Sequence, residues 1–230
     1  MSNGTLVQCK GKTAQGNICK KYCHAEDKYC WIHSDQLAAI PNSSCPVTGE
    51  MRCKCKYAIK PQTPPTPKDT FRKLFSDHGN FTHLYIVSEI YKLPNLPQVT
   101  QRLLQNQEDI GLAMVGTVGK EKSDALIVAL KRHILAASET TKAAISGNKR
   151  RLKAAIAAQF TSSTEVAGVL SSFNPAKLPY AVVKQHFDEH NQYIIDLIEL
   201  YLSGQYDEQI EEYDCYINHL LMFADMLSSA

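Results

Sequence analysis

The sequence lacks several features that would assign it to a common class of protein. It has no apolar run of about eighteen residues, so we expect no membrane-spanning helix. Its first eight residues carry neither a basic start nor an apolar stretch, so we expect no secretory signal and an intracellular, cytoplasmic protein. It also lacks the Gly-x-x-x-x-Gly-Lys phosphate loop and the Gly-x-Ser-x-Gly nucleophile elbow, which mark two large groups of enzymes.

Cysteine is present but very unevenly distributed. Seven of the eight cysteines lie between positions 9 and 55, and only Cys215 lies beyond. Such a density in a short segment is typical of secreted disulfide scaffolds. Here the missing signal and the closing Cys30-x-x-His33 pair favour metal ligands over disulfides.

Four of these residues form the predicted zinc site: Cys9, Cys19, Cys30 and His33. Three thiolates and one imidazole make the closed tetrahedral set that structural Zn²⁺ prefers, and zinc is therefore the cofactor we expect. A module this small has too little apolar surface to fold alone, so metal binding should supply its folding free energy.

The remaining cysteines leave the choice of ligands open. Cys23 could replace Cys9, which gives the alternative set Cys19, Cys23, Cys30 and His33. A second site of four thiolates would use Cys23, Cys45, Cys53 and Cys55. The other interpretation of this stretch is a loop that carries free thiols.

The sequence predicts two domains and a linker between them. Residues 1–59 form the zinc-binding module, with the finger at 9–33 and the possible second site reaching to residue 55. Residues 60–68 contain four prolines and form a stiff linker without a core. Residues 69–230 show helical amphipathic periodicity and no strand alternation.

The second domain is predicted to be all-α, a bundle of about six antiparallel helices joined by short connections. We expect the helices at residues 70–93, 97–115, 121–146, 149–172, 179–203 and 207–228. Asp69 or Thr70 should cap the first helix, and Gly116 should end the second.

Histidines stand on or beside the apolar faces of these helices. With one asparagine they give a predicted buried polar cluster: His78, Asn106, His133, His190 and His219. We expect nearby side chains to hydrogen-bond the imidazoles, namely Asp77, Glu189, Asn106 and Asp225. The cluster then either fixes helix register or holds a metal; His186 and His190 are spaced to chelate one ion, although no Glu-x-x-His motif is present.

Charge is also unevenly distributed. Residues 1–60 hold 9 Lys and Arg against 4 Asp and Glu, whereas the rest of the chain holds 16 against 19. A basic zinc module could contact nucleic acid phosphates. The alternative is that the lysines keep a small module in solution, since the surplus is sparse compared with dense nucleic-acid-binding patches.

Residues 9–33 resemble a small zinc finger that has a Thr-x-x-Gly-x-x-Cys segment and a closing Tyr-Cys-x-x-His. The matching residues are Thr13, Gly16, Cys19 and the run Tyr29–His33, whereas Cys23 is extra. This finger, with three cysteine ligands and one histidine ligand, recurs in proteins of large DNA viruses and in some phage and bacterial proteins.

Residues 70–228 are similar to an uncharacterised helical-bundle family of bacilli, clostridia and large DNA viruses. The similarity is carried by Leu74–Thr82, Arg102–Ile110, His133–Ala137, Asn174-Pro175, His190, Tyr213-Asp214 and His219–Asp225. The family commonly has Glu where Arg132 stands and Trp where Phe81 stands. It also has a Trp-Tyr-x-Asn-Ala-Asp segment in place of residues 159–164. These departures weaken any catalytic centre built from those positions. No established activity comes with the family, so the resemblance implies a fold and little else.

These observations predict a zinc-binding, non-enzymatic structural or protein-interaction protein that is virus-encoded and carried in the virion. We expect a protein partner. Two alternatives stay open: a nucleic-acid-associated protein that uses the basic finger, and a metalloenzyme with a histidine and carboxylate site inside the bundle.

Overall fold

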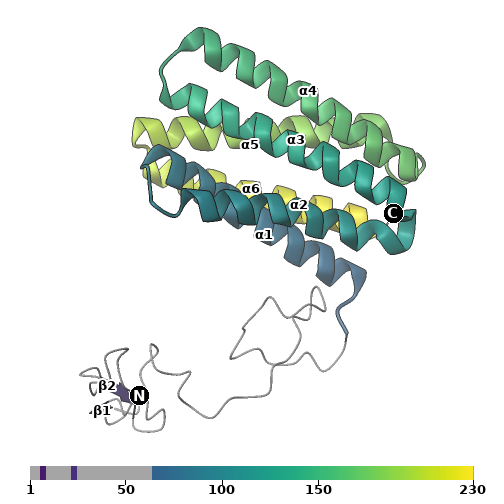
Figure 1. Cartoon of the computed structure of the whole chain (residues 1–230), viewed down its shortest axis with the longest axis horizontal. Helices are drawn as coiled ribbons and strands as arrows, with labels where there is room; N and C mark the ends of the chain where they lie inside the picture. Colours follow the sequence, from purple (N-terminus) through teal and green to yellow (C-terminus); the bar gives the residue numbers. More distant parts are fainter. Residues whose placement is uncertain (1–5, 9–21, 25–63, 230) are drawn as a thin grey trace. The chain divides into compact units, whose positions relative to one another are not determined.

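The computed structural model describes residues 6–8, 22–24 and 64–229. The chain divides into two compact units, Met1–Pro64 and Pro65–Ala230. In sequence, this division falls within the proline-rich stretch 60–68. Figure 1 shows the chain coloured along its sequence.

Two short strands are described in the first unit. Strand β1 is Leu6–Gln8 and strand β2 is Tyr22–His24. They pair in antiparallel register, with Val7 opposite Cys23.

The second unit is a bundle of six helices, and the predicted all-α class is confirmed there. The helices are α1 Pro67–Ile90, α2 Leu96–Val118, α3 Lys120–Ile145, α4 Lys149–Phe173, α5 Tyr180–Ser203 and α6 Tyr206–Ser228. None of the helices in the described residues combines the length and the apolar character that a membrane span requires.

Each helix packs against the next, and α6 packs back against α1, so the bundle closes on itself (Figure 1). Further contacts join α1, α3 and α5 to one another. These three helices therefore form the inside of the bundle, and α2, α4 and α6 fill the spaces between them on the outside.

Ion pairs confirm that neighbouring helices run in opposite directions. Arg72, near the start of α1, binds Asp225 near the end of α6 with an Nε to Oδ1 distance of 2.6 Å. Arg151 at the start of α4 binds Glu139 near the end of α3 at 2.7 Å. The alternation makes α1, α3 and α5 parallel to one another, so they bring equivalent levels of the bundle together.

Two predicted helix boundaries are wrong, each for a local reason. Thr66, not Asp69 or Thr70, caps α1: its hydroxyl accepts the backbone N–H of Asp69 at 3.1 Å, and the Asp69 carboxylate accepts the backbone N–H of Thr66 at 2.9 Å. Helix α2 passes through Gly116 and ends at Val118, because the next residue, Gly119, has a positive φ of 83° and caps the helix.

Two glycines allow neighbouring helices to approach closely. A Cβ on Gly79 of α1 would overlap Ile217 and lie 2.9 Å from Leu220, both on α6. A Cβ on Gly111 of α2 would overlap Ile127 of α3. At both positions the absence of a side chain brings the helices together.

Candidate functional site: a buried histidine cluster

The predicted zinc ligands lie almost entirely outside the described residues. This applies to Cys9, Cys19, Cys30 and His33, and to Cys45, Cys53 and Cys55 of the possible second site. Cys23, the residue that leaves the ligand set open, belongs to β2.

The predicted polar residues of the bundle all lie in its interior. His78 on α1, Asn106 on α2, His133 on α3, His190 on α5 and His219 on α6 each have side chains that are buried. A partly buried residue of α5, His186, joins them through ring contacts. We call the five imidazoles the histidine cluster: His78, His133, His186, His190 and His219.

The rings of the histidine cluster form two contacting groups, His190 with His78 and His133, and His186 with His219. The His190 ring centroid lies 5.5 Å from that of His78 and 5.7 Å from that of His133, so α5 meets both other inner helices here. The His186 ring stacks on His219 at 3.8 Å with an interplanar angle of 4°. On Phe223 it stacks at 4.0 Å and 12°.

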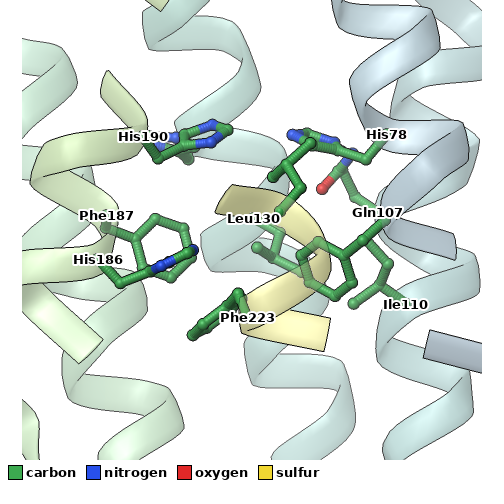
Figure 2. Close-up of a pocket in the computed structure, with 11 residues that line it drawn as sticks. His78, Gln107, Ile110, Leu130, His186, Phe187, His190 and Phe223 are labelled. Atoms are coloured by element: carbon green, nitrogen blue, oxygen red, sulfur yellow. The ribbon is translucent and has the colours of Figure 1, made fainter. Parts of the chain in front are cut away.

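Four of the five histidines line a small cavity in the centre of the bundle. The cavity has a free volume of about 20 Å³. Three phenylalanines, Phe75, Phe187 and Phe223, contribute apolar walls. Figure 2 shows His190 and His78 facing each other at the top of this cavity, with Phe187 below His190 and Phe223 at the bottom. The space suffices for about one water molecule.

The hydrogen bonds of His78 define its protonation. Gln107 directs its side-chain amide nitrogen to the carbonyl of Leu103 at 3.0 Å, to Asn106 Oδ1 at 3.2 Å and to His78 Nδ1 at 3.2 Å. Because the first two partners accept only, this atom is the amide donor. His78 Nδ1 therefore accepts, and the ring is neutral.

His133 has the opposite tautomer. The hydroxyl of Ser162 donates to the carbonyl of Gln159 at 2.6 Å, so it accepts from His133 Nδ1–H at 3.0 Å. The other ring nitrogen of His133, Nε2, is buried without a hydrogen-bond partner among the described residues. It keeps a lone pair that no donor satisfies.

The carboxylates that the sequence suggested as partners serve other roles. Asp77 pairs with Lys73 and with Arg102, while Asp225 pairs with Arg72 and Lys68. That part of the prediction is wrong for these two residues, because long cations on neighbouring turns and helices reach the carboxylates from outside the bundle.

Glu189 is the carboxylate that does face the cluster. His219 Nε2 donates to the backbone carbonyl of His186 at 3.1 Å, and its Nδ1 lies 3.8 Å from the Glu189 carboxylate. Glu189 is exposed, so it marks the edge at which the histidine cluster meets solvent.

Burial lowers the pKa of these imidazoles. The pKa of His78 falls to about 4, although its hydrogen bond to Asn106 opposes the shift. That of His133 falls to about 3 and that of His186 to about 2, in both cases through burial first and a neighbouring histidine second. Burial, reinforced by the four other histidines, holds the pKa of His190 well below its usual value.

Within residues 64–229 no group of three or more His, Cys, Asp or Glu side chains is arranged to hold a metal ion. His186 and His190 have the spacing that the sequence suggested for chelation. In the structure, however, His186 lies between the rings of His219 and Phe223. The arrangement resembles aromatic packing more than a ligand shell.

A second buried polar group lies between α4 and α5, and it was not predicted from the sequence. Gln159 donates to Asn191 Oδ1 at 3.0 Å, and Asn191 donates to the hydroxyl of Ser163 at 2.6 Å. All three side chains are fully buried. We call these three residues the amide centre. Amphipathic periodicity cannot reveal it, because polar residues on a helix are normally placed on the solvent face.

A wide, open groove lies along α5 and α6. It has a volume of about 490 Å³ and is lined mainly by carboxylates: Asp196, Glu199, Glu208, Glu211 and Glu212. Burial raises the pKa of Glu212, and the nearby charge of Asp196 adds to the shift. The groove is thus strongly acidic and would repel phosphates.

Comparison of the chain with known protein families, with curated proteins and with solved structures found no match. The resemblances of residues 9–33 and 70–228 to viral and bacterial proteins therefore stay predictions.

Proposed function

We propose that this protein binds zinc through Cys9, Cys19, Cys30 and His33 and acts as a non-enzymatic structural or protein-interaction component. The chemistry of the donor set supports the zinc part, because three soft thiolates and one imidazole suit Zn²⁺ and fill its tetrahedral shell. Thiolates also require a reducing environment, so an intracellular, cytoplasmic location belongs to the proposal.

The wider groove along α5 and α6, of about 490 Å³, is open and lined mainly by carboxylates. The small size of the central cavity, where the imidazoles gather, is the observation that carries the non-enzymatic part. Its volume of about 20 Å³ is far below the roughly 300–1,000 Å³ of typical small-molecule sites. The imidazoles that line the cavity face the interior of the bundle, where a substrate would have to displace other side chains. The bundle therefore fits the role of a rigid body that presents its surface to a partner protein.

Elemental analysis of the purified full-length protein tests the zinc site. We expect about one zinc per chain, lost when Cys30→Ser removes a thiolate ligand. Cys215→Ser is the matched control, because Cys215 is an exposed residue of α6 and should leave the zinc content unchanged. Equal zinc in all three proteins would contradict the proposed ligands.

The same measurement addresses the possible second site. If Cys23, Cys45, Cys53 and Cys55 bind a second ion, the wild-type protein contains about two zinc ions per chain, and Cys53→Ser reduces this to one. If the zinc content of Cys53→Ser equals that of the wild type, the second site is excluded and the proposal keeps a single zinc site. Metal other than zinc that persists in Cys30→Ser would favour the metalloenzyme alternative, for which the described residues offer no ligand group.

Nucleic acid binding is the second candidate, and the basic charge of residues 1–60 favours it. The acidic groove of the bundle would repel a phosphate backbone, so such binding should depend on the zinc module alone. We expect its affinity to fall steeply with rising salt and to vanish in Cys30→Ser. Absent or salt-insensitive binding of DNA and RNA would remove this candidate.

The proposal extends to a virus-encoded protein that is carried in the virus particle, on the strength of the resemblance of its finger and bundle to proteins of large DNA viruses. Mass spectrometry of purified particles would detect the protein in amounts comparable with other internal components. Its absence from particles, together with its presence in infected cells, would restrict the proposal to the cell.

A further inference from the structure

The histidine cluster is built to be neutral. His78 Nδ1 accepts a hydrogen bond from Gln107, so a proton on that nitrogen would face an N–H group. His133 already donates from Nδ1, and its Nε2 has no acceptor within reach among the described residues. The cavity of about 20 Å³ holds about one water molecule, too few to hydrate imidazolium ions at several of the four histidines that line it.

The charged groups around the cluster offer little compensation. Towards it, α5 contributes the carboxylate of Glu189, which lies near His219, and α6 contributes the neutral phenol of Tyr216, 5.5 Å from His190. The other neighbouring charges pair outside the interior: Asp77 with Lys73 and Arg102, Asp109 with Arg102, Asp225 with Arg72 and Lys68, and Arg132 with Glu165.

Three of the imidazoles come from helices that meet in the middle of the bundle. His78, His133 and His190 come from α1, α3 and α5, the three inner helices, at the level where their rings meet. Charges at this level would repel one another across the contacts that join α1, α3 and α5. Mildly acidic solution therefore acts directly on the inner helix contacts.

We propose that the histidine cluster is an acid-sensitive latch, which keeps α5 packed against α1 and α3 while its imidazoles are neutral and releases it when they are protonated. His219 is the entry point, because Glu189 and the carbonyl of His186 both stabilise its protonated form. The His186 ring, stacked on His219, then faces a cation.

The direction of the pKa shifts sets the pH window. Each imidazole has a lower pKa in the folded bundle than the usual value of about 6.5 in an unfolded chain. The unfolded or opened state therefore binds more protons, and stability is complete above about pH 6.5 and decreases as the pH falls below it. Carboxylates, which titrate near pH 4, act later.

Hydrogen exchange of α5 peptides in the full-length protein, measured from pH 8 to pH 4.5 with correction for intrinsic rates, tests the latch. We expect the protection of α5 to decrease below about pH 6.5 and the opening to take up at most about one proton for each of the five imidazoles. His190→Leu should take up about one proton fewer and open at a lower pH. Asn191→Ala, the matched control in the amide centre, should be less stable and yet take up the same number as the wild type.

Two outcomes would overturn the proposal. One is proton uptake that does not change in His190→Leu, and the other is imidazole NMR signals of the cluster that titrate near pH 6.5 while α5 stays protected. The NMR titration needs only the wild-type protein, so it remains decisive if His190→Leu does not fold. Repeating the exchange experiment with Cys30→Ser separates opening of the bundle from acid release of zinc, because the α5 response should persist.

Discussion

The bundle contains two buried polar centres that differ in one chemical property. The histidine cluster joins α1, α3, α5 and α6, and the amide centre joins α4 and α5. Both are enclosed by apolar side chains, and both fix the relative positions of helices through side-chain contacts. Imidazoles titrate near neutral pH, however, whereas carboxamides and hydroxyls do not.

This difference decides how each centre responds to its surroundings. The amide centre makes its hydrogen bonds at any moderate pH, so its contribution to stability is constant. The histidine cluster is stabilising only while its members are neutral, so its contribution depends on pH. Although both centres are buried, the amide centre therefore stabilises the bundle at any moderate pH, whereas the histidine cluster loses its stabilising effect in acid.

The largest expected effect is the pH dependence of wild-type stability. The pKa of His78 is about 4 and that of His133 about 3 in the fold, against about 6.5 in an unfolded chain. Each of these shifts lowers the free energy of unfolding by about 2 kcal/mol when the pH falls from 7 to 5. We expect the free energy of unfolding in urea to decrease by about 4 kcal/mol or more over this range. A free energy of unfolding that stays constant between pH 7 and pH 5 would show that the histidine cluster does not differ from the amide centre in its response to pH.

The second largest effect is expected for a substitution in the amide centre. Asn191→Ala removes two buried hydrogen bonds and leaves the Gln159 amide and the Ser163 hydroxyl with fewer partners, at a cost of about 3 kcal/mol. We expect the same loss at pH 7 and pH 6 in urea unfolding. Asn80→Ala, at an exposed residue that accepts from Tyr213, should change stability by less than about 0.5 kcal/mol.

A smaller effect tests the packing next to His78. Gly79→Ala should destabilise the bundle by about 1–3 kcal/mol, because the new Cβ overlaps Ile217 on α6. Gly168→Ala on α4 is the matched control, since no atom lies near its Cβ position and alanine should stabilise the helix by about 0.5–1 kcal/mol. The melting temperature should decrease in Gly79→Ala and increase in Gly168→Ala. Equal changes in melting temperature would mean that α6 can move away from α1 without cost.

The smallest effect concerns the residue that links α4 to the histidine cluster. Ser162→Ala removes the acceptor of His133 Nδ1–H and should cost about 1 kcal/mol at pH 7. Ser172→Ala, at an exposed position of the same helix, serves as the control. The tautomer of His133, observed through its ring nitrogen shifts in NMR, should become mixed in Ser162→Ala, whereas a fixed tautomer would show that another group orients the ring.

The sequence predicted most of the helical architecture because proline, glycine and amphipathic spacing act locally. It did not distinguish Gly116 from Gly119 as the end of α2, since the positive φ of Gly119 depends on the turn into α3. It also chose Asp69 or Thr70 as the first cap, where Thr66 and Asp69 form a reciprocal pair.

The cluster was predictable in part. Histidines on apolar helix faces indicated buried imidazoles at 78, 133, 190 and 219, and the structure buries all four. Asn106 was predicted as a partner, and it forms a hydrogen bond with His78. The other partners were not predictable, because Gln107, Ser162 and the carbonyl of His186 come from positions that only helix packing brings close. The zinc ligands lie outside the described residues, so their grouping stays a prediction.

By itself, the sequence determined that residues 69–230 form about six amphipathic helices in an up-and-down order, because periodicity and short connections constrain neighbours in the chain. Only the tertiary structure decided that α1, α3 and α5 are the inner helices and that their imidazoles converge on one cavity. The rotation of each helix about its own axis depends on how side chains such as Ile217 and Phe223 interdigitate with other helices. That information is distributed over the whole bundle and cannot be found in any one segment.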